Sequence, residues 1–205
     1  MTPDQLADRA RGLAASAGGR VVIGLTGSPG AGKSTLAEAI VGLLGPRAAL
    51  VPMDGFHLSQ EILTALGRLE RKGAPDTFDA DGLVSLLSRI VEHPERITYG
   101  PVFHRTIEEP IAAGVSVTPN HDIIIVEGNY LLVDHDGWRG VSRWLDEAWF
   151  LRIPPALRHD RLVQRHVRFG RTHDDAELWV RDVDERNARL IDATSAAAHL
   201  IIHGG

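Results

Sequence analysis

A glycine-rich segment at residues 27–34 has the residue types and the spacing of a phosphate-binding loop. Its sequence, Gly27-Ser28-Pro29-Gly30-Ala31-Gly32-Lys33-Ser34, matches the pattern G-x-x-x-x-G-K-[ST] in full. Glycines let backbone N–H groups turn toward phosphate oxygens without Cβ clashes, and a helix N-terminus adds partial positive charge. We expect Lys33 to reach the β- and γ-phosphates, Ser34 to bind Mg²⁺, and Thr35 to complete the nucleotide-binding set.

Two acidic residues each follow an apolar segment that is typical of a buried strand. Asp54 comes after residues 48–53, and Glu127 comes after residues 123–126. In an open parallel sheet ligands bind beyond the carboxyl ends of the strands, so both carboxylates should face the same crevice as the phosphate loop. Asp54 is predicted to accept the proton of a substrate hydroxyl or to orient it, and Glu127 to hold Mg²⁺ directly or through water. The alternatives are a helix N-cap for Asp54 and an ordinary polar strand end for Glu127.

Arginines recur at helical spacing in the last quarter of the chain. They are Arg158, Arg161, Arg165, Arg168 and Arg171, followed by a polar stretch at 172–175. Phosphoryl transfer needs positive charge around the transferred group, commonly from arginines on a mobile lid, and Gly170 suits a break in such a lid. Arg165 and Arg168 are predicted to be catalytic and Arg171 to bind the nucleotide. A solvated helix face is the alternative.

These residues need a scaffold of alternating strands and helices to position them. Apolar runs predict strands, and helical periodicity predicts the helices between them. Strands are expected at 21–25, 48–53, 123–126, 149–153 and 200–202, and helices at 2–19, 33–44, 58–66, from 79 or 81 to 91, 139–147, 155–169 and 176–191. The helix that starts at Asp79 or Asp81 should bury Leu83, Leu86, Leu87, Ile90 and Val91. Prolines interrupt residues 97–118, which favours irregular extended segments with a hairpin around Ala113-Gly114.

This alternation predicts an α/β fold with a mostly parallel, doubly wound sheet. With the phosphate-loop motif at 27–34, the expected domain is a three-layer αβα P-loop NTPase. The chain is read as one domain, 1–205, with an arginine-bearing helical lid at roughly 155–185. Residues 67–76 are read as a surface loop.

Composition narrows the classes of function. The chain has no cysteine, which excludes thiol catalysis and Cys-ligated metal, and its net charge of -5 argues against a nucleic-acid-wrapping protein. The first 19 residues form an amphipathic helix pattern with Thr2 and Gln5 in a capping box, and they do not have the layout of a signal peptide. We expect no membrane segment and a cytoplasmic location. Only Lys33 and Lys72 are lysines among 22 basic residues.

Together these segments resemble the P-loop kinases that include uridine kinase, phosphoribulokinase and type I bacterial pantothenate kinase. The resemblance runs from Val21 to about Ile202. It rests on the phosphate loop, Met53-Asp54-Gly55-Phe56-His57, Arg71-Lys72-Gly73-Ala74-Pro75 with Thr77-Phe78-Asp79, Pro101-Val102-Phe103-His104-Arg105, Val126-Glu127-Gly128 and the lid arginines. It implies that Asp54 is the catalytic base or hydroxyl orienter and that Glu127 assists Mg²⁺ and ATP.

The resemblance leaves the subfamily open. Met53-Asp54-Gly55-Phe56 and Arg71-Lys72-Gly73 are closer to pantothenate kinase than to uridine kinase, but this chain is much shorter, and His104-Arg105 differs from the Tyr-Ser-His of that enzyme. An acceptor pocket of His57, Phe103, His104 and Arg105 is expected, with a polar surface hairpin as the alternative. Lys72 either approaches the substrate or is an exposed loop lysine, and the second interpretation is favoured.

The sequence therefore predicts an ATP- and Mg²⁺-dependent kinase that phosphorylates a hydroxyl of a nucleoside, a pantothenate-like compound or a sugar. Its expected partner is that small-molecule acceptor, with no nucleic acid or membrane, and a homodimer is left open. The rival is a nucleotide-dependent switch or regulatory protein. Neither lysine follows an asparagine, so the guanine-reading Asn-Lys-x-Asp motif is missing, and Asp79-Ala80-Asp81-Gly82 has an ordinary explanation as a helix start. A sensor that lost catalysis is disfavoured by the presence of both Asp54 and Glu127.

Overall fold

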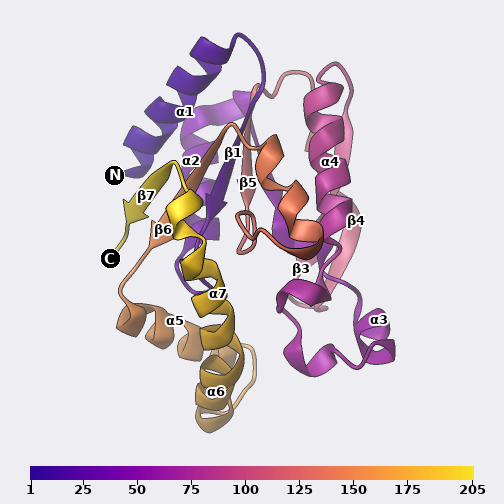
Figure 1. Ribbon diagram of the computed structural model, residues 1–205, viewed down its shortest axis with the longest axis vertical. Helices are drawn as coiled ribbons and strands as arrows, with labels where there is room; N and C mark the ends of the chain where they lie inside the picture. Colours follow the sequence, from indigo (N-terminus) through magenta and orange to yellow (C-terminus); the bar gives the residue numbers. More distant parts are fainter.

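The computed structural model describes all residues, 1–205, and is built around a five-stranded parallel sheet (Figure 1). The order across the sheet is β2-β5-β1-β6-β7. The strands are β1 Val21–Thr26, β2 Ala48–Pro52, β5 Ile123–Glu127, β6 Glu147–Arg152 and β7 Leu200–His203. Each predicted strand is present within a residue or two of its expected bounds. The prediction of a doubly wound parallel sheet is confirmed.

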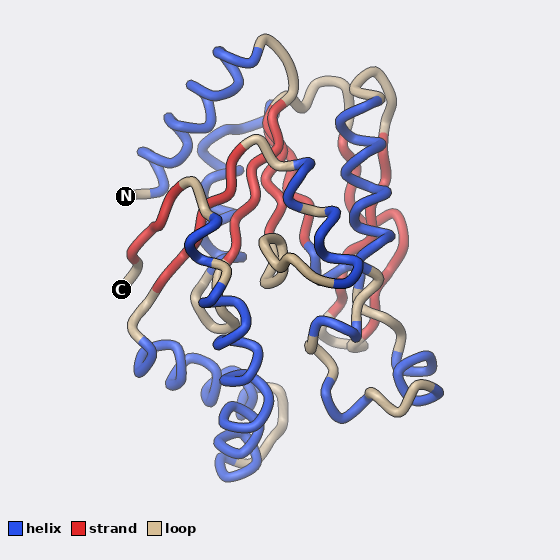
Figure 2. The backbone as a smooth tube through the Cα atoms, viewed as in Figure 1, coloured by secondary structure: helices blue, strands red, loops and turns tan.

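Helices cover both faces of this sheet, as the backbone trace shows (Figure 2). The flanking helices are α1 Pro3–Ala17 and α2 Lys33–Leu44 on one side, and α4 Ala80–Glu92 and α7 Glu185–Ala193 on the other. Successive residues of β5 alternate between the two layers: Ile123 and Ile125 pack with α1 and α2, while Ile124 and Val126 pack with α4 and α7. Burial on both faces explains why this strand is apolar throughout. The predicted three-layer arrangement is confirmed.

The helix termini follow the expected local chemistry. Gln5 N–H donates to the Thr2 side chain and Thr2 N–H donates to the Gln5 side chain, so the predicted capping box opens α1. Gly45 ends α2 with a positive φ of 68°. No helix is both long enough and apolar enough to cross a membrane.

Residues 97–118 form the predicted hairpin, but its turn is not at the predicted position. Strands β3, Thr98–His104, and β4, Glu109–Val117, are antiparallel, and they are joined at 105–108. Ala113 and Gly114 lie inside β4, where the register shifts opposite Gly100 and Val102. A Cβ on Gly114 would lie 2.1 Å from Val102 Cγ1, so this glycine permits a close backbone approach at a bulge rather than forming a turn.

The helix predicted at 139–147 is also absent. Two 3₁₀ turns, Asp136–Gly140 and Ser142–Trp144, take its place, and Glu147 opens β6. The cause is packing against α4, because a Cβ on Gly137 or on Gly140 would lie 3.0 Å from the side chain of Ala80 or Val84. Tertiary contact has overridden helical periodicity here.

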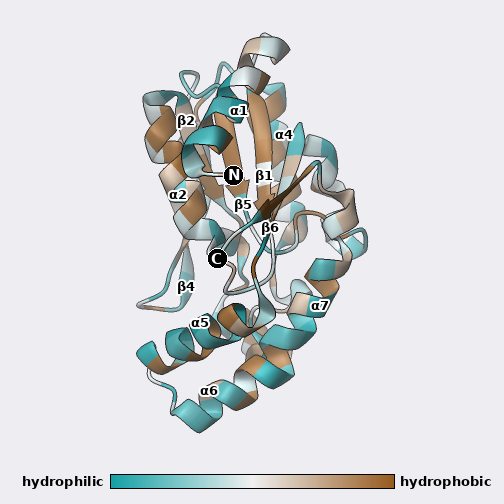
Figure 3. Cartoon of the chain, turned by 90° about the vertical axis from the view of Figure 1, so that its left-hand side faces the viewer, coloured by the Kyte–Doolittle hydropathy of each residue, from teal (hydrophilic) through white to brown (hydrophobic).

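The remaining helices differ from their predicted bounds. Helix α3 is shorter, Gln60–Ala65, and α4 leaves Val91 39% exposed because its buried stripe ends at Ile90. The region predicted to be a lid contains α5, Pro155–Arg168, and α6, His173–Trp179; a π-helical turn, Val180–Asp184, joins α6 to α7. The predicted single helix at 176–191 is therefore α6 and α7 around a π-turn. These helices project below the sheet and have strongly polar outer faces (Figure 3).

Candidate active site

The register of the parallel strands brings three segments to one edge of the sheet. Leu25 of β1 and Pro52 of β2 both lie level with Glu127, the last residue of β5. Gly27, the first residue of the phosphate loop, follows Leu25 by two residues, and Asp54 follows Pro52 by two residues. Both segments therefore lie near Glu127 at the carboxyl edge of the sheet. A cleft of about 1050 Å³ opens there, and Lys33, Asp54 and Glu127 all line it.

The phosphate loop joins β1 to α2, and its glycines are required by its surroundings. Gly27 has φ 148°, and a Cβ there would lie 2.4 Å from the backbone oxygen of Leu151. Gly30 has φ 79°, and its Cβ would lie 2.8 Å from Leu162 Cγ in α5. Both residues therefore combine a conformation that favours glycine with space for no side chain. The loop is held between β6 and α5.

Lys33, the first residue of α2, is buried and points along the loop. Its Nζ donates to Asn129 Oδ1 at 2.6 Å and to the Ser28 carbonyl at 3.2 Å. Burial lowers the pKa of Lys33, while the nearby carboxylates of Glu127 and Asp54 oppose that shift. An ammonium has three donors, so one is free for a phosphate oxygen.

Glu127 and Ser34 form an oxygen pair beside Lys33. Ser34 Oγ donates to Glu127 Oε2 at 3.3 Å, and Glu127 is 7% exposed. Burial raises the pKa of Glu127 to about 7, against the opposing charge of Lys33. A hydroxyl and a carboxylate next to a phosphate site are the donors that Mg²⁺ uses when substrate phosphates and water supply its other ligands. The chain has no cluster of three or more His, Asp or Glu residues that would hold a metal by itself.

Asp54 lies in a 3₁₀ turn, Met53–Phe56, directly after β2. This turn has Pro52 at its N-cap, and the next helix is capped by Ser59, whose hydroxyl accepts from Ile62 N–H. The capping alternative for Asp54 is therefore excluded. Its carboxylate faces the cleft instead, where Oδ2 accepts from Arg105 Nη2 at 3.2 Å.

An aromatic cluster forms the wall beside Asp54. The His57 ring lies between Phe78 and Phe103, with centroid distances of 4.0 and 4.6 Å. His57 Nδ1 is 2.8 Å from the Asp54 carbonyl, a contact in which the ring nitrogen must donate. Burial lowers the pKa of His57, so the ring is neutral at pH 7. All three rings line the cleft.

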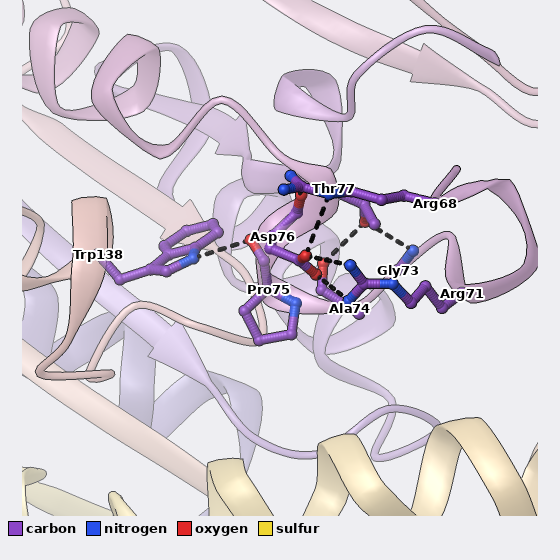
Figure 4. Close-up of polar contacts among 8 residues, drawn as sticks. All are labelled: Arg68, Arg71, Gly73, Ala74, Pro75, Asp76, Thr77 and Trp138. Atoms are coloured by element: carbon purple, nitrogen blue, oxygen red, sulfur yellow. Dashed lines mark hydrogen bonds and ion pairs between the residues drawn. The ribbon is translucent and has the colours of Figure 1, made fainter. Parts of the chain in front are cut away.

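Residues 68–77, which we call the acceptor-side loop, form the next part of this wall. Lys72 from this loop is only 13% exposed and lines the cleft; its Nζ donates to the Glu108 carbonyl at 2.5 Å and lies 5.0 Å from the centre of the Phe103 ring. The interpretation of Lys72 as an exposed loop lysine is therefore wrong. Around it the loop is tied together by its own hydrogen bonds and by Trp138 (Figure 4).

The lid arginines divide into three groups. Arg161, Arg165 and Arg171 line the cleft, where Arg161 Nη1 donates to the Ala31 carbonyl of the phosphate loop at 3.4 Å. Burial lowers the pKa of Arg165, and the nearby charge of Arg105 adds to that effect. Arg158 is buried and forms an ion pair with Glu185 at 2.7 Å. Arg168 is exposed and lies outside the cleft.

Most of the predicted site residues share this cleft. Those that line it are Pro29, Gly30, Gly32, Lys33, Ser34, Thr35, Asp54, His57, Phe103, Arg105, Glu127, Arg165 and Arg171. Three residues of the phosphate loop are buried and do not line the cleft, namely Gly27, Ser28 and Ala31. His104 and Arg168 are exposed and also lie outside the cleft.

Sequence reasoning missed several residues of the cleft. They are Asn129, His166, Trp179, Asp184 and Asn187, together with Gly73. Asn129 had a usable signal, since it follows Glu127 by two residues at the end of a buried strand. The others come from the lid helices and a loop, where only the tertiary fold shows which side chains turn inward.

Comparison with known proteins gives one partial family match and several kinase relatives. A model of the family described as "Methylmalonyl Co-A mutase-associated GTPase MeaB" matches residues 5–55, a segment that holds the phosphate loop and less than half of the chain. The "Putative uridine kinase C227.14" of Schizosaccharomyces pombe is 35% identical over 160 residues, which are 74% of this chain and 68% of that protein. A "Pantothenate kinase" of Serratia proteamaculans is 30% identical over 159 residues; the match spans 72% of this chain but only 50% of that enzyme.

A solved structure extends the similarity to the whole chain. The crystal structure of a "putative fructose transport system kinase" from Silicibacter sp. TM1040 superposes with a TM-score of 0.87 at 37% identity, covering 98% of this chain and 99% of that one. Sequence relatives and fold therefore point to the same group as the phosphate loop, Asp54 and Glu127. The chain belongs to the P-loop kinase family that includes uridine kinase and pantothenate kinase, and it is an ATP-dependent small-molecule kinase.

Proposed function

We propose that this chain transfers the γ-phosphoryl group of ATP to a hydroxyl of a small molecule that Asp54 prepares for attack. The observation that carries the proposal is that Lys33 of the phosphate loop, Asp54 and Glu127 line one common cleft. In the proposed step the acceptor oxygen bonds to the γ-phosphorus, the bond to the β,γ-bridging oxygen breaks, and ADP leaves. The acceptor proton passes to a carboxylate oxygen of Asp54.

The nucleotide side supplies positioning and charge. The amides of the phosphate loop and Lys33 would hold the β- and γ-phosphates, since Lys33 is already fixed by Asn129 at the mouth of the loop. Arg165 is a well placed lid arginine to neutralise charge on the transferring group, because it is half-buried and lines the cleft. Arg171 is stacked on Trp179, 3.8 Å from the ring centre, and would contact the nucleotide from the lid.

Mg²⁺ fits the donor set of this site. Ser34 and Glu127 present a hydroxyl and a carboxylate oxygen at one point beside the phosphate loop. When bound there, the ion would neutralise phosphate charge during transfer. The role of this chain is to hold those two oxygens next to Lys33.

On the acceptor side Arg105 holds the carboxylate that the acceptor hydroxyl must reach. Arg105, whose side chain is 44% exposed, contacts Oδ2 of Asp54, so the acceptor hydroxyl would approach Oδ1 of the carboxylate that Arg105 orients. We take the acceptors to test from the names of the relatives, which mention uridine, pantothenate and fructose. We put a ketohexose first, because the superposition on the structure named for fructose covers almost all of this chain and of that one.

A nucleotide-dependent switch is not favoured. The match to a GTPase family covers residues 5–55 only, a segment that includes the phosphate loop common to many nucleotide-binding proteins, while the kinase relatives match most of the chain. A cytoplasmic location and a homodimer are further parts of the proposal, to be tested by cell fractionation and by light scattering.

The central test is Asp54→Asn, assayed with Mg·ATP against nucleosides, pantothenate and ketohexoses. Turnover should fall by about 10²–10⁴-fold, the usual contribution of a positioned base, with ATP affinity largely kept. Asp136→Asn is the matched control, since it makes the same chemical change at a residue on an exposed turn outside the cleft. Full turnover in Asp54→Asn would remove Asp54 from the mechanism.

A further inference from the structure

Helix α7 is in contact with both walls of the cleft, at its two ends. It is the helix that runs from the lid up to the edge of the sheet (Figure 1). Near its C-terminal end, Asp192 Oδ1 accepts from Ser28 Oγ at 2.6 Å. Ser28 belongs to the phosphate loop and is 4% exposed. A charged acceptor at this distance makes a strong hydrogen bond, so α7 is attached to the phosphate loop.

Near its other end, α7 is attached to the acceptor-side loop. Asn187, which is 6% exposed, directs its Nδ2 to the Gly73 carbonyl at 3.4 Å. The same carbonyl accepts from Tyr130 Oη at 2.5 Å. Two donors from separate elements therefore converge on one backbone oxygen, whose residue has a φ of 100°. Gly73 is the point where the loop meets both α7 and the segment after β5.

Internal hydrogen bonds hold the acceptor-side loop together, so a shift of Gly73 would also move Lys72 and the rest of the loop. Gly73 N–H donates to Thr77 Oγ1, and that hydroxyl donates to the Ala74 carbonyl (Figure 4). Arg71 donates both terminal nitrogens to Asp76, at 2.6 and 2.5 Å. A displacement of Gly73 must therefore move the loop as a unit.

The helix between the two attachments is rigid. Asn187 and Asp192 are five residues apart, about 7.5 Å along the axis at 1.5 Å per residue. Ala188 and Ile191 on the same helix are fully buried, and Ile191 packs in the core under α4. Glu185 adds an ion pair to Arg158 of α5. Such an element carries a shift at one end to the other instead of absorbing it.

We propose that α7 links the phosphate loop to the acceptor-side loop, with Asp192 and Asn187 as positioning residues for phosphoryl transfer. This rests on the proposed function in assigning the two loops to the two substrates. The consequence is that occupation of the phosphate loop orders the loop that carries Lys72. Phosphoryl transfer depends on the distance between acceptor oxygen and phosphorus, which a fixed spacing between the loops would maintain.

The test is amide hydrogen exchange in the full chain, with Mg·AMP-PNP as the probe. In the wild type the probe should slow exchange at 27–34 and also at 68–77. In Asn187→Ala it should still protect 27–34, while protection of 68–77 falls by about fivefold, the change expected for one hydrogen bond of ordinary net strength. Arg189→Ala, on the exposed face of α7, is the matched control and should keep both effects. Undiminished protection of 68–77 in Asn187→Ala would overturn the link.

A second arm uses no nucleotide and so stands apart from the proposed function. Asp192→Ala and Ser28→Ala should each speed exchange at 68–77 in the free protein, and the double variant should add little, because both remove one contact. Asp192→Asn keeps an oxygen that can accept from Ser28 and should restore slow exchange. Unchanged exchange at 68–77 in both single variants would contradict the link, whatever the result with AMP-PNP. Retained turnover in Asp54→Asn would instead contradict only the proposed function.

Discussion

The two walls of the cleft are built in different ways. On the nucleotide side the chain uses backbone: a strand, a loop of glycines that leave no room for Cβ atoms, and the first turn of α2. On the acceptor side it uses side chains, namely His57, Phe103, Arg105 and Lys72, carried by a 3₁₀ turn, a hairpin and a loop. The first construction fixes one ligand shape. The second leaves the acceptor to be decided by a few exchangeable residues.

Two charged residues on each wall also differ in exposure. Lys33 and Glu127 are both less than 8% exposed, whereas the side chains of Asp54 and Arg105 are 30% and 44% exposed. A buried wall must be satisfied by its own contacts, so it tolerates little change. An open wall can be remodelled at low cost in stability, which is consistent with one family phosphorylating different acceptors.

The largest contrast is expected between two glycines with positive φ. Gly27→Val should abolish nucleotide binding and lower the free energy of unfolding by about 3 kcal/mol, because its Cβ would lie 2.4 Å from a backbone oxygen. Gly73→Ala on the acceptor side meets no atom within 4 Å. It should cost only about 1 to 2 kcal/mol of backbone strain and leave nucleotide binding intact. Urea unfolding and AMP-PNP titration measure both. Equal losses in the two variants would remove the contrast between the walls.

The next contrast lies within the lid. Arg165→Ala should reduce kcat/KM by about 10²–10³-fold, the usual cost of removing one preorganised charge from a transfer site. Arg168→Ala should stay within about twofold, because Arg168 is exposed outside the cleft. Steady-state kinetics at saturating acceptor separates the two. A large loss in Arg168→Ala would mean that lid closure brings this residue to the phosphates.

The nucleotide wall could be predicted from sequence because its determinants are local. The spacing of Gly27, Lys33 and Ser34 is a continuous motif, and Glu127 directly follows a strand whose apolar run is unbroken. Parallel register then brings separate strand ends to one level, which requires no knowledge of side-chain packing. The predicted fold and this half of the site therefore follow from one kind of pattern.

The acceptor wall could not be predicted in the same way, because its contacts join distant segments. Arg105 reaches Asp54 across 51 residues, and Asn187 reaches Gly73 across 114. The sequence pattern predicted a hairpin turn at Ala113-Gly114, but Gly114 is required there because Val102 packs closely against its backbone. A glycine chosen for packing and one chosen for a turn look alike in one sequence. The location of Arg105 at the true turn depends on that distinction.

A smaller effect is expected at the arginine that pairs with the proposed base. Arg105→Ala should raise the KM for the acceptor by about tenfold, the cost of one hydrogen bond to a charged group, and leave the KM for ATP unchanged. Arg139→Ala is the matched control, since Arg139 pairs with Asp134 on an exposed turn outside the cleft. Kinetics with each substrate varied in turn measures both constants. An equal rise in the KM for ATP would place Arg105 on the nucleotide wall instead.

The smallest expected effect is a pH dependence of the acceptor wall. Burial lowers the pKa of His57, so on acidification the unfolded chain takes up a proton before the native state does. The free energy of unfolding should therefore fall as pH drops below about 6.5, with a slope from this one group of at most about 1.4 kcal/mol per pH unit. His57→Phe keeps a ring between Phe78 and Phe103 but cannot be protonated, so its slope over pH 5 to 7 should be shallower by about that amount or less. Identical slopes in urea unfolding of the two proteins would show that the ring is already open to solvent, which would make this wall still looser than its contacts indicate.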